Sequence, residues 1–455
     1  MPMEHRTVDV QTFLNEHPFS RFQWIIFALC FLVVLLDGFD TSAIGYIAPS
    51  LITEFGVARP ALAPVLSAAL FGLAFGALAS GPFADRLGRK AVLVGAVLVF
   101  GLACLAASSA SSLGQLLGWR FVTGLGLGAA MPNAVTLMSE YCPDRSRATL
   151  TNTMVCSFPL GAAFGGFLAS WMIPQFGWRS VLLLGGIVPM VLGLLMLIRL
   201  PESVRHMVAK AQPAERIRAA LRRISAAADG AAAFVMTETR AAAEGSAGLG
   251  LVLSRAYVIG SAMLWVAYFM GLVIFYALIN WMPILFRDAG LDPRSAALVA
   301  ALFPLGGVGA IFFGWLMDRT NGNLVIAAGF ALTAVAICAI GQVLGTTGLL
   351  MPVVLLGGTL MNTAQSSLPA LAAAFYPTQG RATGVGWMLG LGRFGGIAGS
   401  FLVAELSRRQ LALPSIFTVV AVPGLIAAAA LVMKQAAHPE VRRAGVAAAG
   451  PALGH

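Results

Sequence analysis

The sequence Leu36-Asp37-Gly38-Phe39-Asp40-Thr41 lies in the middle of an apolar run that covers residues 22–52. The run is long enough to cross a bilayer, which takes roughly 20 helical residues. A carboxylate in hydrocarbon costs about 2.5–3.5 kcal/mol on insertion scales, so a simple anchor would not carry two of them. Asp37 and Asp40, three residues apart, share one helix face, and their mutual repulsion favours a proton on one of them. We interpret them as a proton-coupling site, with a static ion-paired role as the alternative.

The composition predicts a protein that crosses the membrane many times. Of the 455 residues, 58% are hydrophobic and 11% are charged, whereas a soluble protein carries about 25% charged residues. The net charge of +10 does not indicate nucleic-acid binding, because the basic residues lie in short segments between the apolar runs, where they act as topology signals. The five cysteines lack metal or redox spacing, and the five histidines lie outside the apolar runs. We therefore expect no metal ion and no cofactor.

Twelve apolar runs of spanning length predict an all-α membrane protein with twelve transmembrane helices in two pseudo-symmetric six-helix bundles. They cover residues 22–50, 60–83, 91–110, 114–140, 148–173 and 179–199, and then 256–285, 294–317, 322–345, 349–375, 382–406 and 412–433. With the N-terminus inside, most Lys and Arg residues fall in cytoplasmic segments, which places both termini in the cytoplasm. The predicted parts are a cytoplasmic N-terminal segment 1–21, a bundle 22–199, a cytoplasmic linker 200–253, a bundle 254–434 and a cytoplasmic tail 435–455.

The linker contains apolar residues at helical spacing between Ala214 and Ile224. This pattern predicts an amphipathic helix that lies along the cytoplasmic face of the membrane. Binding of a regulator by this helix is the alternative.

The two groups of six runs are related in sequence. Gly81-Pro-Phe-Ala-Asp85-Arg86 recurs 233 residues later as Gly314-Trp-Leu-Met-Asp318-Arg319. A constant offset predicts two homologous bundles of the same orientation, with a site between them near the midplane. Pro159 stands in the first half where Arg393 stands in the second. We interpret this unmatched charge as a functional addition.

The segment from Gly81 to Lys90 falls between the second and third predicted helices and carries Asp85 among glycines and basic residues. Its glycines permit close helix contact and a tight turn, and Asp85 can accept hydrogen bonds from a helix N-terminus or an arginine. We interpret the segment as a breakable latch on the cytoplasmic side. The predicted latch residues are Gly81, Asp85, Arg86, Gly88, Arg89, Glu140, Arg147, Asp318 and Arg319. Because the second copy lacks the following Gly-Arg-Lys, symmetric latching stays open.

Two arginines are predicted near the depth of the paired carboxylates. At the rise of an α-helix, Arg120 lies ~11 Å below the outer surface and Arg393 lies ~18 Å into its helix. Arg120 either joins the proton-coupling site with Asp37 and Asp40 or acts as structural glue. An unpaired guanidinium near the midplane is costly, so Arg393 needs an anion, either one of these carboxylates or a bound one. The predicted substrate-binding residues are Arg393, Phe39, Asn133, Phe158, Tyr276, Asn280, Gln365 and Trp387, with packing as the alternative for each aromatic residue.

Two of these motifs resemble signatures of the major facilitator superfamily: the Gly81–Lys90 segment and Arg120-Phe-Val-Thr-Gly124-Leu-Gly126-Leu-Gly128. The stretch from Asp37 to Thr41, together with Asp9-Val10-Gln11-Thr12-Phe13-Leu14-Asn15, Arg120 and Arg393, resembles the aromatic acid:proton symporters of that superfamily. These include the bacterial 4-hydroxybenzoate/protocatechuate and benzoate transporters. The resemblance implies proton-driven uptake of an aromatic carboxylate across the bacterial inner membrane.

Other functions are weighed against this one. Within transport, the alternative is an exporter of drugs or a sugar or organic-acid porter, although two buried carboxylates and two arginines argue against a neutral sugar. An enzyme would need a nucleophile–base or metal constellation, and we find none in the sequence. A receptor of the same fold stays open. The expected partners are a small aromatic carboxylate, protons and the lipid bilayer, without nucleic acid, and the chain is expected to be monomeric.

Overall fold

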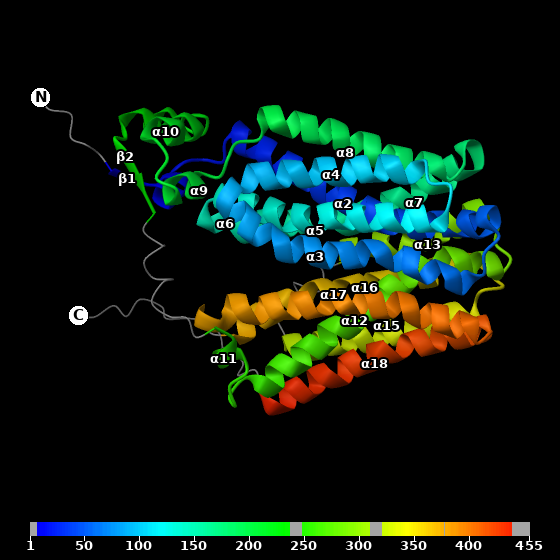
Figure 1. The fold of residues 1–455 in the computed structure, drawn as a ribbon. Helices are drawn as coiled ribbons and strands as arrows, with labels where there is room; N and C mark the ends of the chain where they lie inside the picture. Colours follow the sequence, from blue (N-terminus) through cyan, green and yellow to red (C-terminus); the bar gives the residue numbers. More distant parts are fainter. Residues whose placement is uncertain (1–6, 237–247, 310–320, 377, 439–455) are drawn as a thin grey trace, which may run out of the picture.

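The computed structural model describes residues 7–236, 248–309, 321–376 and 378–438 (Figure 1). Within these residues, eleven helices are long and apolar enough to cross a membrane. They correspond to eleven of the twelve predicted spans. The eighth predicted span begins as the shorter helix α13 (Pro293–Leu305) and the 3-10 turn η4 (Gly306–Gly309), and residues 310–317 of that prediction lie outside the described residues. The predicted all-α membrane fold is confirmed.

The first half of the chain contains one long helix for each predicted span, with a break in the fifth. Its helices are α2 (Arg21–Phe55), α3 (Ala63–Leu87), α4 (Arg89–Ser108), α5 (Leu113–Glu140), α6 (Asp144–Val155), α7 (Ser157–Phe176) and α8 (Arg179–Arg199). The second half contains α12 (Val258–Asp288), α13, α15 (Gly322–Gln342), α16 (Thr347–Phe375), α17 (Thr378–Arg408) and α18 (Leu413–Ala437).

Local sequence explains where several of these helices begin. Ser20 precedes α2 and forms a capping box with Gln23, in which each side chain bonds the backbone N–H of the other. Ser112 caps α5 and Asp292 caps α13 more simply, because one side-chain oxygen of each accepts hydrogen bonds from backbone N–H groups of the first turn. Such caps satisfy N–H groups that a helix leaves unpaired at its first turn. These caps determine where the helices begin, because the apolar interiors contain no residue that marks a helix start.

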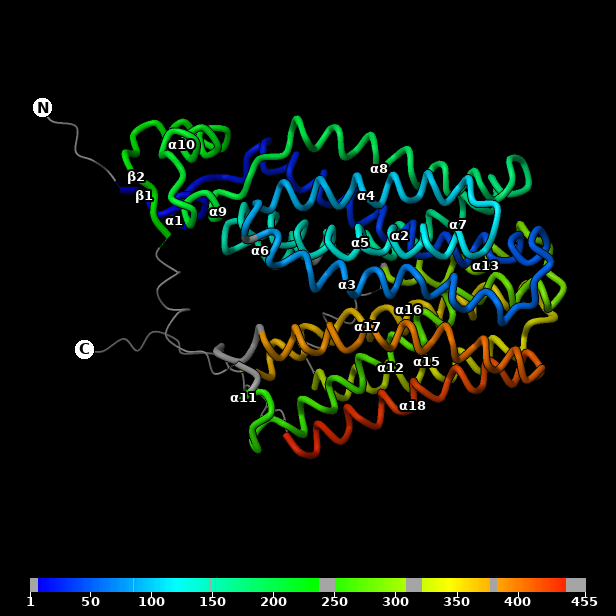
Figure 2. Tube along the Cα trace, viewed as in Figure 1, coloured from blue at the N-terminus to red at the C-terminus, as the bar shows by residue number. Residues whose placement is uncertain are grey.

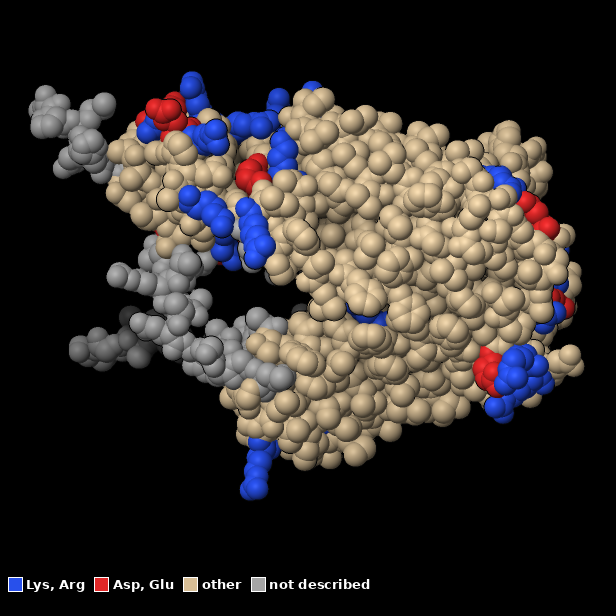
Figure 3. Space-filling model, in the orientation of Figure 1, with Lys and Arg blue, Asp and Glu red and all other residues tan. Residues whose placement is uncertain are grey.

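The helices form two bundles that converge at one end (Figures 1 and 2). The halves touch through α7 with α13, α2 with α12 and α3 with α17. At the end where α2 begins and α18 ends, the halves diverge, and Figure 3 shows a wedge-shaped space between them there. We call this space the central cleft, this end of the molecule the open end, and the opposite end the closed end.

Polar contacts join the two halves at the closed end and in the interior of the molecule. At the closed end, Arg59 Nη2 lies 2.7 Å from Asp288 Oδ1, and Arg287 Nη1 donates to the carbonyl of Pro49 at 3.4 Å. Deeper in the molecule, Arg393 Nη1 donates to the carbonyl of Leu73 at 3.1 Å. The described structure is therefore closed at one end and accessible from the other.

Short elements form a cap on the first half at the open end (Figure 1). They are β1 (Thr7–Asp9), α1 (Val10–Glu16), α9 (Val204–Ala209), α10 (Ala214–Arg222), the 3-10 turn η2 (Ala226–Gly230) and β2 (Ala233–Val235). β1 and β2 pair in parallel, a small sheet that the sequence did not predict. A separate short helix, α11 (Gly248–Val252), precedes α12.

The amphipathic helix α10 differs from its prediction. Its apolar residues Ile217 and Leu221 belong to the same buried cluster as Phe13 and Leu14 of α1, and the Arg223 guanidinium lies 3.9 Å from the centre of the Phe22 ring. The apolar face is thus covered by protein, not by the membrane surface that we expected. Helical periodicity identifies an apolar face but does not say what covers it.

Candidate functional site

Asp40 is held inside the first half by a buried ion pair. Arg120 Nη1 lies 2.9 Å from each carboxylate oxygen of Asp40, and Arg120 Nη2 donates to the Asp40 carbonyl at 3.1 Å. The Cys104 thiol donates to Asp40 Oδ1 at 3.1 Å. Neither Arg120 nor Asp40 is more than 1% exposed. The ion pair joins α2 to α5, and the Cys104 thiol adds α4 to the same carboxylate.

Asp37 faces a different environment although it lies only one helical turn away. It is 2% exposed and accepts a hydrogen bond from Thr41 Oγ1 at 3.2 Å. It lies within Coulombic range of Arg393 and of Tyr276, both from the second half. Asp37 is thus the carboxylate of α2 that meets the other bundle.

Arg393 projects from α17 at the boundary between the halves. It is half-buried, and its bond to the Leu73 carbonyl of α3 crosses that boundary at 3.1 Å. Two tyrosine rings of α12 pack against the glycines that flank it: a Cβ at Gly392 would lie 2.3 Å from Tyr268, and one at Gly396 would lie 2.5 Å from Tyr276. Arg393 is therefore bracketed by aromatic rings along α12.

Close backbone contact positions the carboxylate helix. A Cβ at Gly38 would lie 1.9 Å from the carbonyl oxygen of Phe158 on α7, so only glycine permits this approach of α2 and α7. The contact helps to set the rotation of α2, in which Asp40 meets Arg120 while Asp37, on the same helix face one turn away, lies within range of Arg393.

Of three further predicted residues, Phe158 contacts the other half, and Gln365 and Trp387 contact residues of their own half. The Phe158 ring lies 6.3 Å, centre to centre, from Phe275 of the second half. Gln365 Nε2 donates to the Tyr268 carbonyl at 3.3 Å. Trp387 is 44% exposed and stacks on Trp265 at 6.0 Å.

The other predicted substrate contacts have packing or bonding partners of their own. Phe39 fills a notch in the first half, where Cβ atoms at Gly165 and Gly185 would approach its ring to 3.1 and 3.2 Å. Asn280 Nδ2 donates to Ser400 Oγ at 2.9 Å, and Asn133 Nδ2 donates to the Ala129 carbonyl of its own helix at 2.8 Å. The notch around Phe39 argues for packing as its role, because a ring enclosed by glycines of its own bundle does not reach the boundary.

The structure also reveals residues that were not predicted. Cys104 contacts Asp40, and Thr41 contacts Asp37. No local sequence pattern predicts the contact of Cys104, because it joins α4 to the pair formed by Asp40 of α2 and Arg120 of α5.

The described latch residues meet partners of the first half. Ser203 Oγ donates to Glu140, and Arg89 Nε lies 4.0 Å from a Glu140 oxygen. Arg147 pairs with Asp144 at 2.8 Å. Gly88 has a φ of +101°, which a side chain would strain.

Glu202, at the start of the linker, caps α4 beside this turn. Its Oε1 accepts from the backbone N–H of Lys90 at 3.2 Å, which suits a carboxylate at a helix N-terminus. Arg86 is exposed, and a Cβ at Gly81 would meet no atom within 4 Å. The side chain of Asp85, and all of Asp318 and Arg319, lie outside the described residues.

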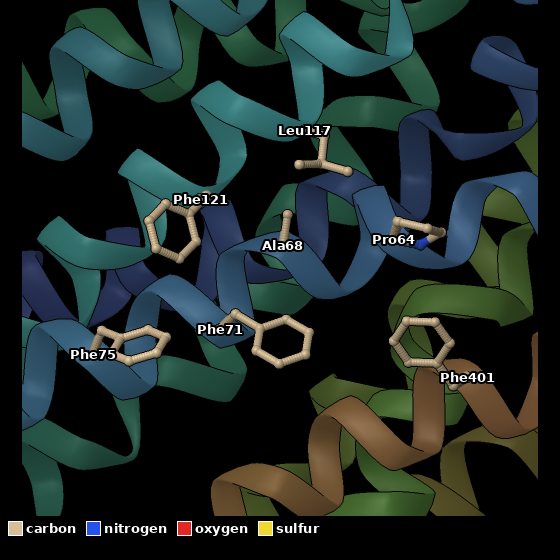
Figure 4. Close-up of a pocket in the computed structure, with 7 residues that line it drawn as sticks. All are labelled: Pro64, Ala68, Phe71, Phe75, Leu117, Phe121 and Phe401. Atoms are coloured by element: carbon tan, nitrogen blue, oxygen red, sulfur yellow. The ribbon is translucent and has the colours of Figure 1, made fainter.

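A separate apolar pocket of about 310 Å³ lies where α3 and α5 meet α17 (Figure 4). No charged side chain lines it, so it does not suit a carboxylate. Its lining residues are Pro64, Ala68, Phe71, Phe75, Leu117, Phe121 and Phe401.

Comparison with known proteins agrees with this architecture. A family model described as Major Facilitator Superfamily matches residues 30–400 and 264–453. The chain is 49% identical over 428 residues to the 4-hydroxybenzoate transporter PcaK of Pseudomonas aeruginosa, which covers 94% of this chain and 96% of that one. It is 44% identical over 425 residues to a gallate transporter of Pseudomonas putida, covering 93% and 94% of the two chains.

Among solved structures, the fold matches the inward open conformation of the xylose transporter XylE from Escherichia coli. The TM-score is 0.71 at 18% identity, over 90% of this chain and 95% of that one. At this identity the match concerns the fold alone.

Proposed function

Because the chain belongs to the Major Facilitator Superfamily, we propose that it is a proton-coupled symporter that imports an aromatic carboxylate by alternating access. The substrate class includes 4-hydroxybenzoate, protocatechuate and benzoate. Relatives that are 44–49% identical over more than nine-tenths of the chain carry 4-hydroxybenzoate and gallate in their names. The protein lies in the bacterial inner membrane as a monomer with both termini in the cytoplasm, and the central cleft opens to the cytoplasm.

The observation that carries this proposal is the separation of the two carboxylates of α2. Asp40 is bound by Arg120 within one bundle, whereas Asp37 lies within range of Arg393 of the other bundle. A charge pair across the moving boundary can respond to a ligand, and a pair within a rigid bundle cannot. Asp37 is therefore the proton carrier, and Asp40 with Arg120 holds the helix that presents it.

Arg393 is the group that binds the substrate carboxylate. A planar guanidinium fits a carboxylate through two parallel N–H···O bonds. When Asp37 takes up a proton, it no longer competes for Arg393, and the guanidinium becomes available to the substrate. Binding of the anion and binding of the proton are then coupled through one arginine.

The proton also accounts for the electrical balance of uptake. A monoanion that enters a cell with a negative interior works against ~2.3 kcal/mol per 100 mV. One accompanying proton cancels that charge. Accumulation therefore needs a protonatable group whose state depends on substrate occupancy, and Asp37 meets that description.

Other parts of the chain have supporting roles in this proposal. Phe158, Tyr276, Gln365, Asn133 and Trp387 line the route of the substrate between the bundles. The segment from Gly81 to Lys90, with Glu140, Arg147, Asp318 and Arg319, latches the cytoplasmic end when the transporter faces outward.

The test measures substrate binding and proton-driven uptake side by side in purified protein and proteoliposomes. Asp37→Asn mimics the protonated carboxyl, so we expect it to bind 4-hydroxybenzoate and exchange it but to lose accumulation under a pH gradient. Arg393→Ala should lose binding, and Arg393→Lys should recover little of it because an ammonium lacks the planar fork. Arg409→Ala, which removes an exposed cation paired with Glu405, is the matched control and should behave as wild type.

Two results would contradict these roles. One is full accumulation by Asp37→Asn. The other is wild-type affinity in Arg393→Ala. Xylose and a cationic drug, included as ligands, test the alternative porter and exporter functions, and saturable uptake of either in place of the aromatic acids would favour those alternatives.

A further inference from the structure

The two tyrosines that bracket Arg393 lie at different distances from the central cleft. Because α12 runs from the open end to the closed end, Tyr268 lies two turns, or ~12 Å, nearer the open end than Tyr276. Tyr268 is half-buried, whereas Tyr276 is only 9% exposed. The space beside Arg393 is therefore accessible on the Tyr268 side.

The Tyr276 side is filled by contact between the halves. Tyr276 packs edge-on against Phe275 at 5.2 Å, and Phe275 meets Phe158 of the first half at 6.3 Å. The ring of an aromatic acid whose carboxylate binds Arg393 would consequently point away from this packing and toward Tyr268, on the side nearer the open end.

Polar groups are available at that position. The Tyr268 side chain lies beside the Gln365 amide and within Coulombic range of Arg393. Two contacts hold the Gln365 side chain in place. Its Nε2 donates to the Tyr268 carbonyl at 3.3 Å, and its Oε1 packs against Gly271, where a Cβ atom would lie only 1.8 Å from that oxygen. The Tyr268 ring packs directly against the backbone of Gly392, which leaves no room for a Cβ atom there. The Tyr268 hydroxyl, which can both donate and accept, thus lies near Arg393, where the ring of an acid bound to that arginine would reach it.

We propose that Tyr268 hydrogen-bonds the ring hydroxyl of the transported acid and that Gln365 is the residue that positions it. The inference rests on the proposed function and deepens it, because it makes hydroxylated benzoates the preferred substrates over benzoate. A site built to bond a substrate hydroxyl rejects the analogue that lacks it, since the protein group is then left without its partner. Tyr268 is a specificity-determining residue, and Arg393 supplies the affinity common to both acids.

The experiment measures the affinity of the full-length purified protein for 4-hydroxybenzoate and for benzoate by calorimetry. We expect wild type to bind 4-hydroxybenzoate about tenfold more tightly, as one hydrogen bond allows. Tyr268→Phe should lower the affinity for 4-hydroxybenzoate about tenfold and leave the affinity for benzoate unchanged, so that the two affinities become similar. Gln365→Met should reduce the same ratio in part, with little effect on benzoate.

Tyr257→Phe is the matched control, because Tyr257 packs on Phe375 and Tyr376 near the start of α12. It should keep the wild-type ratio. If Tyr268→Phe does not fold, wild type is compared with 4-hydroxybenzoate and 4-methylbenzoate, which share a para substituent but differ in hydrogen bonding.

Three results would overturn the inference: an unchanged ratio in Tyr268→Phe, equal losses for both acids, or wild-type protein that does not distinguish 4-hydroxybenzoate from 4-methylbenzoate. Failure of the proposed function looks different. In that case neither aromatic acid binds wild type, or both bind Arg393→Ala as tightly as wild type.

Discussion

The Arg120–Asp40 pair illustrates how a charge is accommodated inside an apolar bundle. Both side chains are removed from water, and each loses solvation that the partner has to replace. The Asp40 carboxylate receives Arg120 at 2.9 Å on both oxygens and a Cys104 thiol at 3.1 Å. Removing one partner leaves the other charge buried without compensation, which typically costs about 3–5 kcal/mol.

This reasoning predicts the stability of single and double variants. Arg120→Ala and Asp40→Ala should each lower the thermal unfolding temperature of the detergent-solubilised protein strongly. Arg120→Met combined with Asp40→Leu should recover much of the loss, because it removes both charges while it keeps apolar volume. The exposed pair of Arg409 with Glu405 provides the control, and Arg409→Ala should change stability by less than about 1 kcal/mol.

This account of the pair would be contradicted if the double variant lost as much stability as the two single variants lose together. An uptake assay separates an effect on stability from an effect on transport. The double variant should remain folded yet transport poorly, because α2 would lose one of the contacts that orient Asp37.

At the level of helices, glycine decides which pairs touch backbone to backbone. Gly38 meets the Phe158 carbonyl of α7, and Gly161 of α7 meets the Leu35 carbonyl of α2, at 1.9 and 1.8 Å from the positions where their Cβ atoms would stand. The contact is therefore reciprocal. A carbonyl that belongs to a helix cannot rotate away as a side chain can, so a methyl group at either glycine would separate the two helices.

Gly38→Ala should therefore destabilise the protein by about 1–3 kcal/mol, as overpacking does, and lower its yield. Gly95→Ala on α4 is the matched control, because a Cβ there meets no atom within 4 Å. That control should be neutral or slightly stabilising, since alanine favours a helix more than glycine does. The measurement is thermal unfolding of both variants, and equal unfolding temperatures would show that α2 and α7 tolerate more separation than the structure indicates.

At the level of the whole molecule, the conformation depends on contacts at the closed end. Arg59 with Asp288 at 2.7 Å and Arg287 with the Pro49 carbonyl at 3.4 Å join the halves there. Alternating access requires these contacts to break when the closed end opens. They bias the equilibrium toward the described state by a modest amount, because partly exposed ion pairs contribute about 0.2–1 kcal/mol.

Charge reversal tests this bias. Arg59→Asp should shift the population toward opening at the closed end several-fold, and combining it with Asp288→Arg should restore the original distribution. The measurement is the spin-label distance between Ser111→Cys and Leu411→Cys, two exposed positions in different halves at the closed end, in a Cys156→Ser background.

Arg408→Asp is the control for this experiment, since Arg408 pairs with Glu405 within one half. It should leave the distance unchanged. If Arg59→Asp also leaves the distance unchanged, the ion pair does not set the conformation, and the remaining contacts between the halves hold the closed end together.

Much of the fold follows from the sequence because its determinants are local. The length and apolarity of each run decide whether a helix can span the membrane, and eleven such helices are present in the described residues. The constant offset between the halves predicts the two bundles. The energetic cost of charge in hydrocarbon identifies Asp37, Asp40, Arg120 and Arg393 as residues that need partners.

The choice of those partners required the tertiary structure. Arg120 binds Asp40 and not Asp37, Arg393 bonds the Leu73 carbonyl, and Phe39 turns into a notch of its own bundle. Each outcome depends on how a helix is rotated about its axis. Helices that are apolar on every side give little information about that rotation. Close contacts such as that of Gly38 with Phe158 set it instead, and they join residues that are distant in sequence.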